Sequence, residues 1–596
     1  MTSRLRLALA ALALGTSGLS TAGRARAESA HSAYEQESID AALRARGQVI
    51  DPAPEGKTIE GMDLLTLPVF EERDPAPGFL NGVHVTTRWH VIERELLFAT
   101  GDRWQSARVE ESARNLRELS QLSLVLIVPV RGTRLDRVRA LVITKDVWSL
   151  RLDSYFEAVN GRLTTLLVRP AETNVAGTHA TAGVLLGLGP DTYVVGLAAG
   201  DRRIAGSRLQ AIGSANLIAN RATGDLEGSF GWFYYGRPLW SLEATWGFDT
   251  LVAWRDEIFR RYVGTRDGVG VRRYDSPATP EVDDLPWEYA SERLFASHQV
   301  VRSFGRAFKH DLGFGVEADR RAFRLSGGVG GPAARDFLRD EVPVGDTRVS
   351  PYVQLHAHTS EYRSVLDFNT LGLQEDYKLG HDVYVRIYPA AEGAGSTRTL
   401  LGLYAAGTYT VPLGDGLARA LVAVTREEDT RDRDVGRLEA ATRIVTPRLG
   451  FGRFVHDTGL VNHWDNHLNE RLVLGGDSRL RGFAPFELIG DDVVASNLEL
   501  RTSALDVLKV QVGGVLFHDA GGVADRLPEI AVHQSVGVGL RLVFPQFDRA
   551  VVRIDWGFPL EHERDPLPGA FYATVGQAFE MPLARPPGSG ALLFDP

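Results

Sequence analysis

The fold of this chain is indicated by two stretches near its C-terminal end. The first is the Gly-rich run Leu474-Gly475-Gly476-Asp477-Ser478-Arg479-Leu480-Arg481-Gly482-Phe483, and the second is Phe517-His518-Asp519-Ala520-Gly521. The glycines allow tight turns, so the first stretch is predicted to be a loop, whereas the second ends a run of β-type residues. An arginine folded into a protein needs an acceptor, and a carboxylate can take two hydrogen bonds from its guanidinium. Arg481 is therefore expected to find a carboxylate partner, and Asp519 lies at a strand position from which a side chain can point inward.

Five segments with the pattern of β-strands follow this loop, at about 493–503, 508–518, 532–544, 550–557 and 571–579. A lone R-G-F run is usually an ordinary turn, but R-G-F followed by F-x-D-x-G and five strands is far more specific. This combination resembles the signature of the BamA/TamA-type outer-membrane assembly and translocation barrels, a superfamily that includes the two-partner-secretion transporters. The resemblance implies that the loop folds back into the barrel and meets the inner wall. The residues that it assigns to this loop–wall pair are Arg481, Gly482, Phe483, Phe517, Asp519 and Gly521.

The region from 149 to 579 alternates between apolar and polar residues, which is the period of a β-strand. Examples are Trp240–Trp246, Leu312–Ala318, Val353–Ala357, Val536–Phe544 and Val552–Trp556. In a soluble sandwich the apolar set faces a core, whereas in a membrane barrel it faces lipid. The period alone does not choose between these two. The signal-like N-terminus and the loop motif favour a mainly β fold, a transmembrane antiparallel β-barrel.

The resemblance also implies the number of strands. In this superfamily the loop follows the eleventh strand, so five further strands give a barrel of sixteen. The first strand is expected at about 162–169, and the stretches 262–292 and 326–349 are predicted to be extracellular loops. A sheet that crosses a bilayer has to close, because every backbone N–H and C=O needs a partner in hydrocarbon.

The closing strand is predicted at Phe571–Phe579, with Gly576 three residues before its aromatic end. Glycine weakens and bends a strand. In the superfamily this bend lies at a lateral seam between the first and last strands, so the resemblance assigns Gly576 and Phe579 to that seam. The alternative is that Gly576 is a simple packing glycine. The chain departs from the superfamily pattern because a tail, residues 580–596, follows the aromatic residue.

Three segments precede the barrel. Residues 1–27 are predicted to be a signal peptide, since Arg4 and Arg6 precede an apolar run and Ala25-Arg26-Ala27 forms an A-x-A site. Residues 28–56 are polar, with one helix expected at about 34–46. Residues 57–148 show the order β-α-α-β-β, which resembles one POTRA domain, an α+β unit. Any small α+β domain would give the same order.

An edge strand in this domain is the predicted docking site for client polypeptides. The strand at 122–130 is apolar and contains Pro129, which is tolerated at the edge of a sheet. Such an edge can accept an extended segment as an added strand. The residues assigned to this role are Leu124, Leu126 and Val128. The alternative is that the strand simply belongs to the core.

The composition excludes several classes of function. The chain has no cysteine, and therefore neither disulfides nor thiol chemistry. Removal of residues 1–27 takes away four of the 66 basic residues and none of the 76 acidic ones, so the net charge becomes −14 and nucleic-acid binding has no electrostatic support. No nucleophile elbow, zinc-helix motif or P-loop is present, so we expect no enzyme activity, cofactor or metal. The run His463-Trp464-Asp465-Asn466-His467 is interpreted as part of a loop rather than as metal ligands.

The favoured function is the assembly and insertion of client β-barrels into the bacterial outer membrane, with the POTRA-like domain in the periplasm. The expected partners are the outer-membrane lipid bilayer, unfolded client polypeptides and periplasmic accessory proteins. The main alternative is a polypeptide translocation pore of the two-partner-secretion type, in which the helix at 34–46 would serve as a plug. A third alternative is a soluble periplasmic β-rich protein that binds or hydrolyses a substrate.

Overall fold

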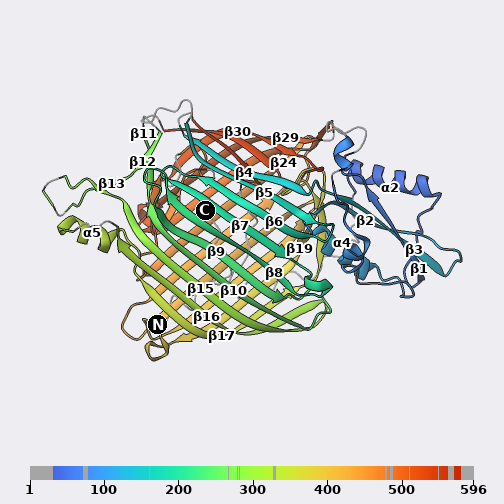
Figure 1. Ribbon diagram of the computed structural model, residues 1–596, viewed down its shortest axis with the longest axis horizontal. Coiled ribbons are helices and arrows are strands. Elements are labelled where there is room, and N and C mark those ends of the chain that lie inside the picture. Colours follow the sequence, from blue (N-terminus) through green and yellow to red (C-terminus); the bar gives the residue numbers. More distant parts are fainter. Residues whose placement is uncertain are drawn as a thin grey trace.

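The computed structural model describes residues 31–578, apart from 71–77, 83, 160–161, 266–267, 278, 281, 327–329, 477–478, 484–486, 509, 548 and 562–568. The predicted signal peptide and the tail at 580–596 lie outside the described residues. The chain forms a small N-terminal α+β domain that abuts one end of a closed β-barrel (Figure 1). Among the described residues no helix is long and apolar enough to cross a membrane.

The N-terminal domain is a three-stranded sheet with helices on both faces. Its order is β1-β3-β2, with β1 parallel and β2 antiparallel to the central strand. One face packs on α3 and α4 through residues such as Ile92 and Leu116, and the other face packs on α2 through Ile39 and Ala42. The elements are α2 (Ala33–Arg46), β1 (Thr58–Leu67), α3 (Trp89–Glu93), α4 (Ser106–Arg117), β2 (Leu122–Arg131) and β3 (Arg137–Asp146).

The helix expected at 34–46 is α2, and local signals explain its limits. Ser32 Oγ accepts a hydrogen bond from the Glu35 N–H while the Glu35 carboxylate accepts one from the Ser32 N–H, which together form a capping box. Gly47 ends the helix in the left-handed conformation. The helix lies on the sheet of the N-terminal domain (Figure 1), and not in the barrel lumen as a plug would.

The barrel is one antiparallel sheet that closes between its first and last strands. In chain order its strands are β4 (Leu150–Val159), β5 (Arg162–Val175), β6 (Ala180–Leu188), β7 (Thr192–Asp201), β8 (Gln210–Asn220), β9 (Leu226–Arg237), β10 (Trp246–Arg260), β15 (Glu288–Phe304), β16 (Phe308–Leu325), β17 (Asp346–Thr359), β20 (Gly380–Ala390), β21 (Leu400–Leu413), β22 (Gly416–Asp429), β23 (Val435–Val445), β24 (Gly452–Asn466), β27 (Asp492–Thr502), β29 (Val510–Ala524), β30 (His533–Val543), β31 (Val552–Pro559) and β32 (Ala570–Val575).

The described residues therefore form a barrel of 20 strands, and the predicted number of sixteen is wrong. The closed sheet contains 21 segments, but the three-residue β28 (Leu505–Val507) only extends the β27–β29 ladder. Five strands follow the Arg481 loop, as predicted, but fifteen precede it instead of eleven. Alternation in a sequence shows where strands lie, whereas the closure of the sheet decides how many belong to one barrel. An even number is typical of bacterial outer-membrane barrels.

Two local predictions are also wrong. The first strand is β4, and the stretch at 162–169 belongs to the second strand. The alternating run Trp240–Trp246 is mostly not a strand, because residues 238–245 connect β9 to β10. In this turn the Leu242 N–H donates to the Glu111 carboxylate of α4. The turn holds the N-terminal domain against the barrel, a long-range contact that local alternation does not reveal.

The barrel wall is apolar outside and polar inside. Outward side chains such as Leu197 and Phe314 have exposed fractions of 67% and 54%, whereas Arg443 and Arg541 on the inner face are among the largest fully buried side chains. A soluble protein has the opposite arrangement, since exposed apolar surface on this scale is unfavourable in water. A lipid-facing exterior around a polar lumen explains it.

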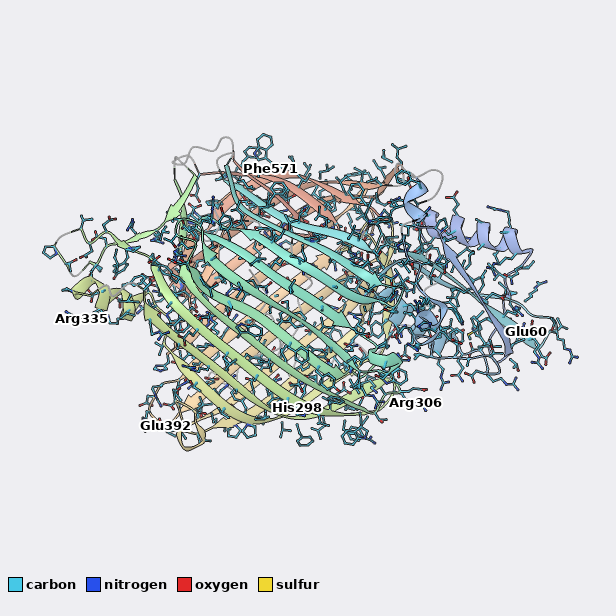
Figure 2. All side chains as sticks on the ribbon, viewed as in Figure 1. Glu60, His298, Arg306, Arg335, Glu392 and Phe571 are labelled. Atoms are coloured by element: carbon cyan, nitrogen blue, oxygen red, sulfur yellow. The ribbon has the colours of Figure 1, made fainter. Side chains whose placement is uncertain are left out.

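The two ends of the barrel differ. Turns near the N-terminal domain bind it, for example through ion pairs of Glu95 with Arg203 and Arg208. Arg335, in one of the two stretches predicted as extracellular loops, lies at the opposite end, and so does Glu392 of the β20–β21 connection (Figure 2). Short ribbons and one helix in the connections are β11 (Tyr262–Thr265), β12 (Gly268–Val271), β13 (Arg273–Tyr274), β14 (Leu285–Pro286), α5 (Pro332–Asp340), β18 (Tyr362–Leu366), β19 (Gln374–Lys378), β25 (Leu472–Leu474) and β26 (Leu488–Gly490).

Candidate functional site in the barrel lumen

Arg481 lies at the tip of the loop between β24 and β27 and is fully buried in the lumen. Its Nε and Nη2 donate to the two oxygens of Asp519 at 2.8 and 2.9 Å, and its backbone N–H donates to the same carboxylate at 3.1 Å. The guanidinium carbon also lies 3.6 Å from the centre of the Phe517 ring. The structure thus brings together the two residues that the motifs paired, in a two-pronged geometry.

Arg481 also binds two carboxylates that the sequence analysis did not identify. Its Nη1 donates to Glu499 Oε1 on β27 at 2.7 Å and to Asp555 Oδ2 on β31 at 3.0 Å. Arg501 and Arg541 balance these acids, since they pair with Glu499 and Asp555 respectively. The only local signal is a charged residue at an inward position of an alternating strand, and many strands of this chain carry one. We call Arg481, Asp519, Glu499 and Asp555 the lumen cluster.

Two glycines let the loop approach the wall. Gly482 has a φ of 101°, which favours glycine, and a Cβ there would lie 3.0 Å from the backbone of Gly557. A Cβ at Gly557 would in turn lie 2.7 Å from the Gly482 nitrogen. Backbone therefore meets backbone without side chains between them. This close approach is what places the Arg481 guanidinium at the depth of the three carboxylates.

The residue after Gly482 connects the loop tip to the last strand of the barrel. Phe483 is buried, and its carbonyl oxygen accepts a hydrogen bond of 2.6 Å from Tyr572 Oη on β32. Its ring lies edge-on to His533 and packs with Leu474 and Leu480. Gly521 makes room for the same cluster, because a Cβ there would lie 2.9 Å from the Leu474 side chain. The loop tip and the closing strand are therefore in direct contact.

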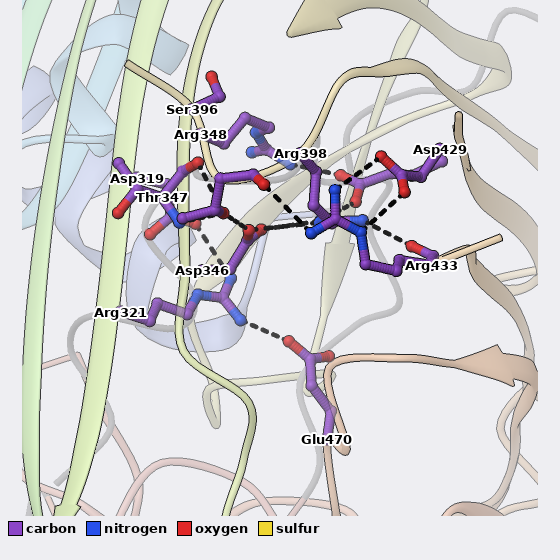
Figure 3. A network of polar contacts seen from close by, with 12 residues as sticks. Asp319, Arg321, Asp346, Thr347, Arg348, Ser396, Arg398, Asp429, Arg433 and Glu470 are labelled. Carbon is purple, nitrogen blue, oxygen red and sulfur yellow. Dashed lines mark hydrogen bonds and ion pairs between the residues drawn. The ribbon is translucent and has the colours of Figure 1, made fainter. Parts of the chain in front are cut away.

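Further ion pairs hold the part of the loop that precedes Arg481. Arg479 donates to Asp457 on β24 at 2.6 Å, and Arg443 on β23 donates to the other oxygen of the same carboxylate. At the end of the barrel opposite the N-terminal domain, Glu470 pairs with Arg321 of β16 within a wider polar network (Figure 3). Arg398 in that network joins Asp346 at 2.7 Å. The loop is thus held at its tip by Arg481, just before the tip by Arg479, and near its start by Glu470.

Among the described residues, the seam between the first and last strands is the shortest ladder that joins two of the 20 wall strands. β32 and β4 share three residue pairs, Phe571 with Ala158, Tyr572 with Glu157 and Ala573 with Phe156, whereas β31 and β32 share six. The ladder ends before Gly576, which has a φ of 108°. The Gly576 N–H donates to the backbone oxygen of Val551, which precedes β31 and not β4. Beyond it Trp148 N–H donates to Gln546 O at 2.6 Å. The other predicted seam residue, Phe579, lies outside the described residues.

Comparison with known proteins places this region in a superfamily. Residues 379–579 match the family model described as the Omp85 superfamily domain. This match covers the C-terminal part of the barrel. The matched region runs from β20 to the closing strand β32. It includes the whole lumen cluster and the β32 side of the seam. The predicted resemblance to the BamA/TamA-type barrels is confirmed at the level of the superfamily, and with it the class of outer-membrane β-barrels. No curated protein matches the chain.

Solved structures of similar outline share little sequence with it. BamA from Haemophilus ducreyi lacking POTRA domains 1–3 is 12% identical with a TM-score of 0.33, over 97% of both chains. CdiB from Escherichia coli is 13% identical with a TM-score of 0.42, over 89% of this chain and 80% of that one. CdiB from Acinetobacter baumannii is 11% identical with a TM-score of 0.37, over 89% and 77%. At such scores these structures say nothing about the function of this chain.

A hairpin that ends where the matched region begins lies across the barrel end that faces the N-terminal domain. It contains β18 and β19 in the connection from β17 to β20, and we call residues 360–379 the mouth hairpin. Its apolar side chains pack on strand ends on the far side of the mouth. The contacts join Val365, Phe368 and Tyr377 to Leu417, Val445 and Val455, and join Leu371 and Leu373 to Val543 and Val551.

Polar contacts fix the mouth hairpin between the barrel and the N-terminal domain. On the barrel side, Thr370 Oγ1 donates to Arg549 O at 2.7 Å. On the domain side, Arg117 of α4 pairs with Asp376 at 2.7 Å, and the Gln374 N–H donates to Glu35 of α2. Burial raises the pKa of the Glu375 carboxyl, which accepts hydrogen bonds from three backbone N–H groups of the hairpin turn. The barrel is therefore capped at this end by the mouth hairpin.

The predicted docking strand is β2, at the edge of the sheet in the N-terminal domain. Leu124, Leu126 and Val128 are buried under α2, so their side chains do not face solvent. Near the end of the strand, Val130 forms an isolated antiparallel β-bridge with Ile50. Among the described residues no strand pairs with the outer backbone edge from Leu124 to Val128. A docking role there would involve the main chain and not these side chains.

Proposed function

We propose that this protein assembles and inserts client β-barrels into the outer membrane through the seam between β4 and β32. The observation that carries the proposal is the length of that ladder: three residue pairs, against eleven between β29 and β30 in the same wall. Backbone groups inside a bilayer have to be paired. A short ladder therefore opens at lower cost than any other, and a client strand can complete the pairing that opening removes.

The lumen cluster supports this role by its position. Tyr572 on the seam strand donates to the backbone of Phe483, next to Arg481, so movement of β32 requires a change at the loop tip. The cluster in turn binds β27, β29 and β31 through buried carboxylates. We propose that it holds the last five strands as one rigid unit, against which the first strand can separate.

The mouth hairpin favours insertion over the alternative of an axial translocation pore. It packs on strand ends across the mouth, and it bonds to both the barrel and α4. A polypeptide that enters from this end along the axis would have to displace these apolar contacts. A client that inserts at the seam would not.

For the N-terminal domain we propose the identity of a POTRA domain that lies in the periplasm. Its β-α-α-β-β order and its contact with the barrel turns support this. The open backbone edge of β2 from Leu124 to Val128 would receive an extended client segment, or a segment of a periplasmic accessory protein, as an added strand. No nucleotide or other cofactor is needed, because strand pairing and burial of apolar surface in lipid supply the free energy.

The decisive experiment is a reversible lock of the seam. Cysteines at Phe156 and Ala573 (F156C/A573C) face each other across it, and opposed residues of antiparallel strands lie about 4.5–5.5 Å apart, within reach of a disulfide. The matched control, F156C/L166C, joins β4 to β5 within the wall. The chain has no native cysteine, so no other thiol can compete.

Under oxidising conditions the seam lock should abolish client assembly in proteoliposomes, and reduction should restore it. The control lock should leave assembly unchanged. If the locked seam still assembles clients, lateral opening is not the mechanism. If it still exports a polypeptide through the lumen, the translocation pore is the correct function.

Docking on β2 has a separate test. A photo-crosslinking residue at Ile127, which is half-buried on the edge strand, should capture a client, and one at Leu135, fully exposed in the β2–β3 turn, should not. Equal capture at both positions would contradict a docking edge.

A further inference from the structure

Two histidines on β17 share an inward face of the barrel near the mouth hairpin. His356 and His358 alternate with Ala357, and the pairing of β16 with β17 places Asp311 directly opposite His356. The two imidazole rings stack with their centres 4.4 Å apart, and the Tyr384 ring stacks on the other side of His356 at 3.9 Å. Neither histidine belongs to the lumen cluster or to the seam.

One nitrogen of each ring is fixed by an acceptor. His358 Nδ1 lies 3.0 Å from the backbone oxygen of Thr359, which can only accept, so this nitrogen carries a proton. His356 Nε2 lies 2.9 Å from the Asp382 carboxylate, which requires a proton on that nitrogen too. In a neutral ring the other nitrogen then carries a lone pair. This is how a second hydrogen bond orients a metal-binding histidine.

The remaining nitrogens converge on one carboxylate oxygen. His356 Nδ1 lies 3.5 Å and His358 Nε2 lies 3.4 Å from Asp311 Oδ2. Asp311 is itself buried, and its Oδ1 has no hydrogen-bond partner among the described residues. Three electron-pair donors thus face a common point, which is unfavourable without a cation between them.

The spacing fits a small metal ion. Ligands of tetrahedral zinc lie at about 2.0–2.1 Å from the metal, so neighbouring ligand atoms are separated by roughly 3.3 Å. All three ligand atoms lie within 4.8 Å of one another. We propose that Asp311, His356 and His358 form a site for a divalent transition metal of the Zn²⁺ type, with a water molecule as fourth ligand. Two imidazoles and one carboxylate suit such a metal better than Mg²⁺ or Ca²⁺, which take oxygen ligands.

The alternative occupant of this point is a proton, which would make one histidine a cation. Asp311 and Asp382 flank His356 and would stabilise that cation, so titration with Zn²⁺ decides between the two occupants. Lys309 lies on the same face of β16 and donates to Leu242 O, and Lys378 pairs with Asp382 at 3.1 Å. The Asp382 carboxylate therefore already has a positive partner besides His356.

The position of the site suggests a structural role for the metal. Lys378 belongs to the mouth hairpin, and Asp382 joins it to His356. A bound metal orients His356, and through Asp382 it holds the second arm of the hairpin to the wall. Asp382 is therefore a positioning residue and not a ligand.

The test uses the full chain in detergent, stripped with a chelator and titrated with ZnCl₂ by calorimetry, with visible absorption of Co²⁺ as a second readout. We expect one ion per chain, tetrahedral Co²⁺ bands, and a higher unfolding temperature with zinc. His356→Asn and His358→Asn should remove the binding. His310→Asn, one residue from Asp311 on the exposed outer face, is the matched control and should bind as the wild type does.

Asp382→Asn should keep one ion per chain with about ten- to hundredfold lower affinity, as loss of a second hydrogen bond does. Absence of saturable one-to-one binding to the wild type overturns the proposal, and this result does not depend on any variant folding. So does an equal loss of binding in the His310→Asn variant, which would show that surface histidines take up the metal.

Discussion

Arg481 combines three roles that no other side chain provides. Its side chain bonds Asp519 with two nitrogens, reaches Glu499 and Asp555 with a third, and lies over the ring of Phe517. Only a planar, permanently charged group with a fixed fork does this, so lysine is not an equivalent residue. Because the guanidinium is fully buried, removal of one partner leaves an uncompensated charge in the lumen. The loss of one partner therefore lowers stability strongly.

We expect Arg481→Ala and Asp519→Ala each to lower the free energy of unfolding by about 3–5 kcal/mol, as loss of one partner of a buried ion pair does. The double variant should lose less than the sum, because the two residues form one unit. Urea titration in detergent measures both. Arg339→Ala, an exposed ion pair with Asp340 on α5, is the control and should change stability by under about 1 kcal/mol. Additive losses would show that the pair does not act as a unit.

Tyr572→Phe tests the link between the loop tip and the seam. It removes the hydrogen bond to Phe483 O and leaves the ring, so we expect a loss of about 1 kcal/mol in stability. Client assembly should change by a larger factor than this stability loss explains. Tyr409→Phe, on the outer face of β21, should be neutral in both assays. Parallel small effects in the two variants would contradict a coupling role.

The sequence predicted the Arg481–Asp519 contact because both residues sit in recognisable local motifs. Glu499 and Asp555 could not be found in the same way. Each is one acid among many at inward strand positions, and only the strand register brings it to Arg481. The histidine site has a weak local signal, His356-Ala357-His358 on one strand face, but its third member comes from the neighbouring strand.

At the scale of elements, the mouth hairpin is the feature that the sequence did not predict. Its strands, β18 and β19, are five residues each, and they lie between two longer wall strands without a change in composition. What makes it a cap is contact with Val543 and Val551, far along the chain. The helices and strands of the N-terminal domain were easier to predict, because α2 and α4 each bury an apolar stripe and α2 begins and ends at local capping signals.

Replacement of residues 362–378 by a short Gly-Ser linker should open the mouth. We expect single-channel conductance in planar bilayers to rise several-fold above that of the wild type, since the hairpin contacts cross the end of the lumen. Shortening of the connection that carries α5, at the opposite end, is the control and should leave the conductance near the wild-type level. Unchanged conductance after removal of the hairpin would show that the lumen is closed elsewhere, by the Arg481 loop.

At the scale of the whole molecule, the number of strands is decided by closure and not by any segment. The five strands after the loop were predicted correctly because each alternates clearly. The strands before it were not counted from the sequence, and the number borrowed from the superfamily was too small by four. An arrangement with apolar residues outside and buried arginines inside is still readable from the alternation, because it needs only the period of two.

The closed wall predicts heat-modifiable migration on gels, with the seam as the place where unfolding begins. An intact barrel stays compact in detergent without heating, and it should migrate differently from the heated chain. Because β4 and β32 share only three residue pairs, the oxidised F156C/A573C lock should raise the temperature of conversion. A disulfide that closes a ladder is worth about 2–4 kcal/mol. The F156C/L166C lock strengthens a ladder of ten pairs that does not open first, so its conversion should stay at the wild-type temperature. Equal shifts for both locks would mean that the wall does not open at the seam.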